Sequence, residues 1–240
     1  MQKFLPKIIS IGILLSSAFS CKLEQRAAVK LVHPELQRDG IHYEGKRVNR
    51  QLHIGPYEVT EIDIKENGSD DEIRLALGEG QRPGWSYLFN LKLRGLQQRV
   101  WLIDCIAHRR SPKDADYAAA LDENRDEINM QCEIAGTNQW KFTLQGKLSH
   151  NLMGTLQPAE GDQVATLQVE VLLWRSVWRY FRRHLPTPLV QGKQGQETIA
   201  AMTLARPQQL WLAKDIEAPT QEALVAVFVA LQMLPAGWEG

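Results

Sequence analysis

The sequence predicts a mostly β fold, either an antiparallel sandwich or a partly closed barrel, with one C-terminal α-helix. Many short runs alternate apolar and polar residues, and turn residues separate these runs. Near the C-terminus this pattern gives way to an unbroken apolar stretch from Ala223 to Leu231. The chain has 240 residues, of which 44% are hydrophobic, so it can bury a substantial core.

Residues 1–20 have the three parts of a secretory signal peptide. Lys3 and Lys7 supply positive charge, the run from Ile8 to Leu15 is almost entirely apolar, and small residues follow it. The apolar run is much shorter than the roughly 20 residues that span a bilayer. We therefore expect the chain to leave the cytoplasm.

The leader ends in Ala18-Phe19-Ser20-Cys21, which resembles the signal of bacterial lipoproteins. The resemblance implies cleavage before Cys21, lipid attachment to that cysteine, and a membrane as partner through the lipid. Because Lys22 rather than Asp follows the cysteine, it also implies an outer-membrane protein that faces the periplasm. An ordinary signal peptidase site, with Ala18 and Ser20 as its small residues, is the alternative.

The mature chain is predicted to be a tether followed by one domain. Residues 21–40 form the lipid-anchored tether, which contains Pro34 and an Asp39-Gly40 turn, and residues 41–240 form a single β-rich domain. Alternation within the second predicted strand is imperfect at Val59 and Glu61. The predicted strands are 48–54, 57–65, 72–77, 85–94, 99–107, 128–134, 140–144, 167–171, 198–204 and 210–214.

Cys105 and Cys132 each lie in a strand-like run, and they remain as a pair once Cys21 is assigned to lipid. In an oxidising compartment we expect them to form a disulfide at the base of a polar insertion. Two reduced, buried thiols are one alternative. Cys105-x-x-His108 as half of a metal site is another, but no second such motif and no paired-histidine spacing occur, so no metal is predicted.

The segment 174–184 is the densest basic and aromatic part of the chain. On a helix its aromatic residues would share one face, beside a stripe of arginines, as in helices that bind anionic lipid at a membrane surface. The same surface suits an anionic glycan or an envelope protein. The alternative is an amphipathic element that packs on its own core. The candidate surface comprises Trp174, Arg175, Trp178, Arg179, Phe181, Arg182 and Arg183.

A helix is predicted over about residues 220–234, with Thr220 as its N-cap and Pro235 as its stop. It has no polar face, so we expect it to be buried, either covering a sheet or plugging a barrel. A final β-strand is the alternative, because several of its residues are valines.

Charge and motifs exclude several classes of function. Without the two lysines of the leader, the chain has 26 basic and 28 acidic residues, a net charge of −2, so no nucleic acid partner is expected. Nucleotide-binding and serine-hydrolase motifs are absent from the sequence, and no cofactor is predicted. Asp104 with His108, or Ser149 with His150, could still contribute to a triad assembled in space.

The sequence thus favours a non-catalytic binding or scaffolding module of the cell envelope, with no catalytic residues assigned. The first alternative is a β-barrel carrier of an apolar ligand, which requires an apolar interior not filled by side chains. The second alternative is a hydrolase of envelope polymers, which requires a cleft where carboxylates or a Ser/His pair converge.

Overall fold

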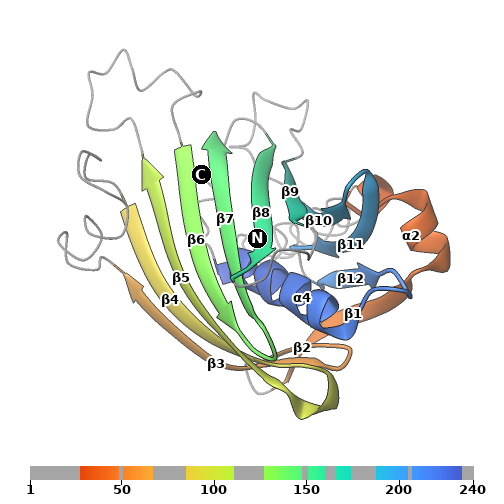
Figure 1. The fold of residues 1–240 in the computed structure, drawn as a ribbon, viewed down its shortest axis with the longest axis horizontal. Coiled ribbons are helices and arrows are strands. Elements are labelled where there is room, and N and C mark those ends of the chain that lie inside the picture. The colour runs from red at the N-terminus through yellow and green to blue at the C-terminus, as the bar shows by residue number, and fades with distance from the viewer. Residues whose placement is uncertain are drawn as a thin grey trace, which may run out of the picture.

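The protein folds as a closed barrel of antiparallel strands with one helix in its lumen (Figure 1). The structure is a computed structural model that describes residues 28–48, 51–66, 85–110, 127–147, 151–159, 166–173, 188–204 and 207–233. The strands are β1 (Ile41–Val48), β2 (Gln51–Ile54), β3 (Tyr57–Glu66), β4 (Trp85–Arg94), β5 (Val100–Arg110), β6 (Glu127–Ala135), β7 (Gln139–Lys147), β8 (Leu152–Pro158), β9 (Leu167–Leu173), β10 (Pro188–Gln194), β11 (Glu197–Thr203) and β12 (Gln209–Leu212). The prediction of a mostly β fold with a C-terminal helix is confirmed, and of the two predicted architectures, sandwich or barrel, the structure has the barrel, which is closed.

Each strand pairs with its neighbours in sequence, and β1 closes the barrel on β12 through the pairs from Ile41↔Leu212 to Glu44↔Gln209. Strand direction therefore alternates around the wall. The odd-numbered strands all end at one end of the barrel, which we call the loop end because its connections include the long segments 67–84, 111–126 and 174–187. The even-numbered strands end at the opposite end, which we call the turn end.

Alternation along each strand separates the lumen from the outer surface. In β6 and β7 every second residue is buried and most of the others are exposed. Because side chains of neighbouring strand residues point to opposite faces, the buried set faces the lumen. On β6 and β7 this set is Ile128, Met130, Cys132, Ile134, Trp140, Phe142 and Leu144.

A β-bulge explains the imperfect pattern of β3. The register with β4 shifts between Val59 and Glu61, so Val59 pairs with Leu93 while Glu61 pairs with Lys92. An extra residue in one strand reverses the inward and outward parity beyond it. Tyr57 and Val59 face the lumen from odd-numbered positions before the bulge. Beyond it, Ile62 and Ile64 face the lumen from even-numbered positions.

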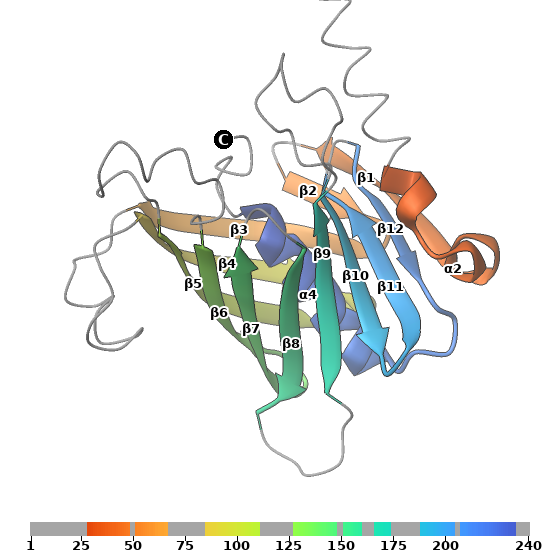
Figure 2. The ribbon, with the colours of Figure 1, turned by 90° about the horizontal axis from the view of Figure 1, so that it is seen from above.

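The C-terminal helix α4 (Ala218–Met233) lies inside the barrel, as Figures 1 and 2 both show. It begins two residues before the expected N-cap Thr220, because Pro219 fits the first turn of a helix, where no backbone N–H is needed. It enters from the turn end, where β12 ends. None of the helices in the described ranges is long and apolar enough to cross a bilayer.

The N-terminal segment is bound to the outer wall of the barrel. A helical turn at residues 28–31 and helix α2 (Pro34–Asp39) lie against β11 and β12 (Figure 2). Val32 and Leu36 pack on the outward side chains of Leu189, Ala201 and Trp211. Much of the segment predicted to be a tether, residues 21–40, is therefore part of the folded body from Ala28 onward.

Several elements differ from the predicted ones. The expected first strand, 48–54, corresponds to β2 and includes only the last residue of β1, so β1 was missed, and β8 and β10 were also not predicted. Gly154 and Gly192 occupy inward positions on these two strands, which removes an apolar residue from the alternating pattern. The predicted strand 72–77 lies outside the described residues.

Candidate functional site

The lumen is the candidate functional site, because apolar side chains from all around the wall converge there on α4. The described part of α4 is buried on every side from Gln221 to Leu231. A helix without a polar face is stable only where apolar groups surround it. On β10 the lumen-facing Gly192 makes room for the helix, because a Cβ there would lie 2.7 Å from a methyl carbon of Leu224.

A buried carboxyl group fixes the first part of α4 to the turn end. Glu222 has no exposed surface, and its Oε1 accepts a hydrogen bond from the backbone N–H of Leu96 at 2.5 Å. Its Oε2 accepts a second from Trp101 Nε1 at 3.1 Å. Arg99 lies 3.7 Å from the same oxygen and is one-third exposed. A buried charge needs this kind of pairing, because desolvation would otherwise oppose folding.

The β4–β5 connection is shaped around this carboxyl group. Gln97 and Gln98 have φ angles of 55° and 63°, a left-handed conformation that is uncommon for residues other than glycine. Gly95 precedes them, and a Cβ at this position would lie 2.6 Å from Glu222 Oε1. The turn thus brings the Leu96 N–H to the carboxyl group at the cost of an unusual backbone conformation.

A second buried polar contact lies next to the first. Gln221 Nε2 donates a hydrogen bond to the Tyr57 hydroxyl oxygen at 2.6 Å. Burial raises the pKa of the Tyr57 phenol well above its ordinary value of 10.0, and the nearby Glu222 charge adds to the rise while the Gln221 hydrogen bond opposes it. Gln221 and Glu222 together attach α4 to β3, β5 and the β4–β5 turn, and the sequence predicted neither contact.

Toward the loop end, the lumen wall has exposed apolar side chains. Ile62 and Ile64 of β3 are 44% and 45% exposed, although their cross-strand partners Leu91 and Phe89 on the same face are buried. Within the described residues, β2 pairs with β3 only through His53↔Glu58 and Ile54↔Tyr57. The later part of β3 therefore extends beyond its short neighbour and leaves its inner face partly uncovered.

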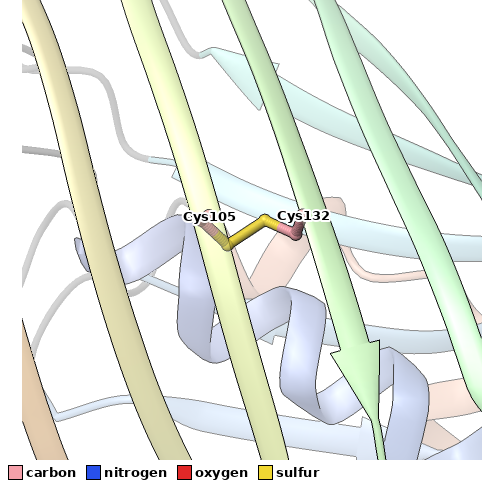
Figure 3. Close-up of a disulfide and its surroundings, with 2 residues drawn as sticks. All are labelled: Cys105 and Cys132. Carbon is pink, nitrogen blue, oxygen red and sulfur yellow. A yellow bond between two sulfur atoms is a disulfide. The ribbon is translucent and has the colours of Figure 1, made fainter. Parts of the chain in front are cut away.

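The predicted disulfide between Cys105 and Cys132 is present (Figure 3). The two residues are directly paired on β5 and β6, and both side chains belong to the apolar core that contains α4. The alternative of Cys105 and His108 as metal ligands is wrong, because residues three apart on a strand point to opposite faces. Among the residues that the structure describes, no group of three His, Cys, Asp or Glu side chains could hold a metal ion.

The predicted binding surface from Trp174 to Arg183 and the predicted lipid attachment site Cys21 lie outside the described residues. The pair Ser149 and His150 is also outside the described ranges. Asp104 and His108 both lie on β5 four residues apart, which separates their Cα atoms by about 13 Å, too far for a shared hydrogen bond.

Comparison of the chain with models of protein families gave no match. Comparison with curated proteins and with solved structures also gave no significant match.

Proposed function

We propose that this protein is a non-catalytic binding protein of the bacterial envelope that takes up an apolar molecule, such as a lipid acyl chain, at the loop end of its barrel. Because α4 and apolar side chains fill much of the lumen, the proposed site is the uncovered inner face of β3 and not an empty interior. Cys21 carries the lipid that tethers it to the outer membrane, and the barrel faces the periplasm. The ligand lies at the loop end of the lumen against the inner face of β3. The apolar helix α4 forms the floor of the site.

The exposure of Ile62 and Ile64 is the observation that carries this proposal. Exposed apolar side chains are ordinary on an outer surface, but here they lie on the inner face of a barrel whose other inward residues are mostly buried. Sites for apolar ligands are concave and lined by apolar groups, and they occur at the mouths of β-barrels. Covering both isoleucines with a ligand would remove apolar surface from water, which favours binding.

The buried carboxyl group of Glu222 has a structural role in this proposal. Its two oxygens are already occupied by Leu96 and Trp101, and Arg99 neutralises its charge. A hydrolase would instead need a carboxyl group free to contact substrate. The polar groups at the turn end therefore support binding by holding the helix in place.

Titration with cis-parinaric acid, a fluorescent fatty acid, tests the proposal on the delipidated protein lacking residues 1–21. We expect saturable binding that unlabelled fatty acid displaces. In an Ile62→Asn/Ile64→Asn variant the Kd should rise by about tenfold, which corresponds to losing roughly 1–2 kcal/mol of apolar contact.

A matched control comes from the outer face of β5. Leu102 is 44% exposed, as Ile62 is, and Val100 is also exposed, but both point away from the lumen. A Val100→Asn/Leu102→Asn variant should bind the probe as the unmodified protein does. If the wild-type protein shows no saturable binding, or if both double variants weaken it equally, the carrier proposal is wrong.

A further inference from the structure

We propose that the anchored protein stands with the loop end of its barrel against the membrane, so that the lumen-facing surface of β3 opens toward the bilayer. This inference rests on the lipid anchor in the proposed function. The orientation gives the proposed binding a direction of transfer, because an apolar ligand would enter and leave the barrel on the membrane side. The partner of this end is a lipid surface.

The N-terminal segment joins the barrel near the loop end. Ala28 is fully buried, and Val29 packs against the cluster that contains Leu189. Leu189 follows the first residue of β10, close to the loop end. The chain then runs along the outer wall toward the turn end, where Gly40 leads into β1 beside Leu212. The N-terminal segment therefore enters the folded body from the loop-end side (Figure 2).

The remaining tether is short. Seven peptide steps separate Cys21 from Ala28, and fully extended they reach about 25 Å. The barrel has a similar height, since the eleven residues of β5 span about 36 Å along the strand and about 28 Å along the axis at a tilt of about 40°. An anchor of this length, attached near one end, keeps that end closer to the membrane on average than the other end.

Residues 28–39, which we call the N-terminal clamp, are bound to the outer wall of the barrel. Val32 and Leu36 are buried against Leu189, Ala201 and Trp211, and Gln191 Nε2 donates a hydrogen bond to the Leu31 carbonyl oxygen at 3.0 Å. Gln37 Nε2 donates to the carbonyl oxygen of Val32 at 3.0 Å and also to that of Val29. Residues 28–39 thus belong to the body, and they cannot lengthen the tether by unwinding without losing these contacts.

The two ends of the barrel differ in the charge of their exposed side chains. β1 finishes at the loop end in Lys46, Arg47 and Val48, all exposed, and Lys30 and Leu31 of the N-terminal segment are exposed as well. Basic and apolar side chains together suit an anionic lipid surface. Glu127 and Lys147 are also exposed at the loop end, whose described exposed residues are net basic. The described exposed residues at the other end are mostly uncharged or acidic, with Lys214 as the basic exception: Gln97, Gln98, Thr137, Asn138, Gln194, Gln196, Glu197, Lys214, Asp215 and Glu217.

Distance-dependent fluorescence quenching tests the orientation. A hexahistidine tag replaces residues 1–21, and the protein is bound to phosphatidylcholine vesicles that contain a nickel-chelating lipid and a lipid with a nitroxide headgroup. A fluorophore is attached to Val48→Cys at the loop end or to Thr137→Cys at the turn end, since the native Cys105 and Cys132 are joined in a disulfide. Chelation makes this test independent of natural lipidation, and it requires no ligand.

We expect quenching at residue 48 to exceed quenching at residue 137 by roughly twofold or more, because the two positions differ in height by a large part of the barrel length. Inserting about thirty Gly/Ser residues before residue 28, with a span of about 30 Å, should reduce the difference. Equal quenching at both positions, stronger quenching at residue 137, or a difference unchanged by the linker would overturn the proposal. The parinaric acid titration reports separately on the binding proposal.

Discussion

Trp101 Nε1 donates a hydrogen bond to Glu222 Oε2 at 3.1 Å, which joins the first part of β5 to the first part of the lumenal helix across 121 residues of sequence. Both side chains are completely buried. The bond, with the Leu96 N–H and Arg99, provides a polar attachment for a helix whose other contacts are mainly apolar. Apolar contacts are not directional, so the register of α4 in the lumen depends on this attachment.

Replacing Glu222 with Gln should destabilise the protein by about 2–4 kcal/mol, because an amide cannot accept both hydrogen bonds and leaves Arg99 without its partner. Urea denaturation measures the free energy of unfolding, and hydrogen exchange of α4 should also accelerate. Glu217→Gln, at an exposed position just before the helix, is the control and should have little effect. Equal stability of the two variants would show that the carboxyl group does not hold the helix.

The buried phenol of Tyr57 should make stability fall at alkaline pH. Its folded pKa is raised above 10.0, so above about pH 10 the unfolded chain releases this proton while the folded protein keeps it. The free energy of unfolding should therefore decrease with pH in that range by up to about 1.4 kcal/mol per pH unit. Tyr57→Phe should remove this contribution, which denaturation of both proteins between pH 8 and about 11 would reveal. Parallel pH profiles would contradict the assignment.

The disulfide should stabilise the barrel mainly by lowering the conformational entropy of the unfolded chain. Cys105 and Cys132 are separated by 27 residues, and a loop of this size predicts about 3–4 kcal/mol. A Cys105→Ala/Cys132→Ala variant should lose about this amount in chemical denaturation, with some additional loss from reduced packing. Non-reducing mass spectrometry of the native protein should detect the linked peptides. Two free thiols in protein matured in an oxidising compartment would contradict the pairing.

The N-terminal clamp should depend on Leu36. This side chain is buried on the outer wall beside Leu189 and Trp211, so Leu36→Ala should cost about 2–3 kcal/mol or release residues 28–39 locally. Hydrogen exchange distinguishes these two results, since local release affects only this segment. Leu31→Ala, at a 41% exposed position in the same segment, is the control and should change stability by less than about 0.5 kcal/mol. Unchanged exchange and stability in Leu36→Ala would mean that the segment is not clamped.

Local pattern predicted many of the elements correctly. The strand at residues 85–94 coincides with β4, and the predicted C-terminal helix at about 220–234 overlaps α4 almost completely. Both follow from periodicity or unbroken apolar composition within one segment. The interruption at Val59 and Glu61 was visible in the sequence, but its meaning as a bulge required the register against β4.

The lumenal site was less accessible to sequence analysis. Glu222 directly precedes the apolar run that begins at Ala223, and a charge beside this run was the available signal for a buried ionic contact. Its partners Leu96 and Trp101 are 126 and 121 residues away, and no local pattern relates them to the helix. Likewise, the exposure of Ile62 and Ile64 depends on how far β2 extends beside β3.

The sequence by itself determined the mostly β composition of the fold, the single buried helix and the cysteine pair available for a disulfide, because each depends on residue types within short segments. The tertiary structure decided that the sheet closes through β1 and β12, that α4 lies in the lumen rather than on a face, and that residues 28–39 bind the outer wall. These outcomes depend on which distant surfaces bury each other, and that choice is made by packing and paired polar groups across the whole chain.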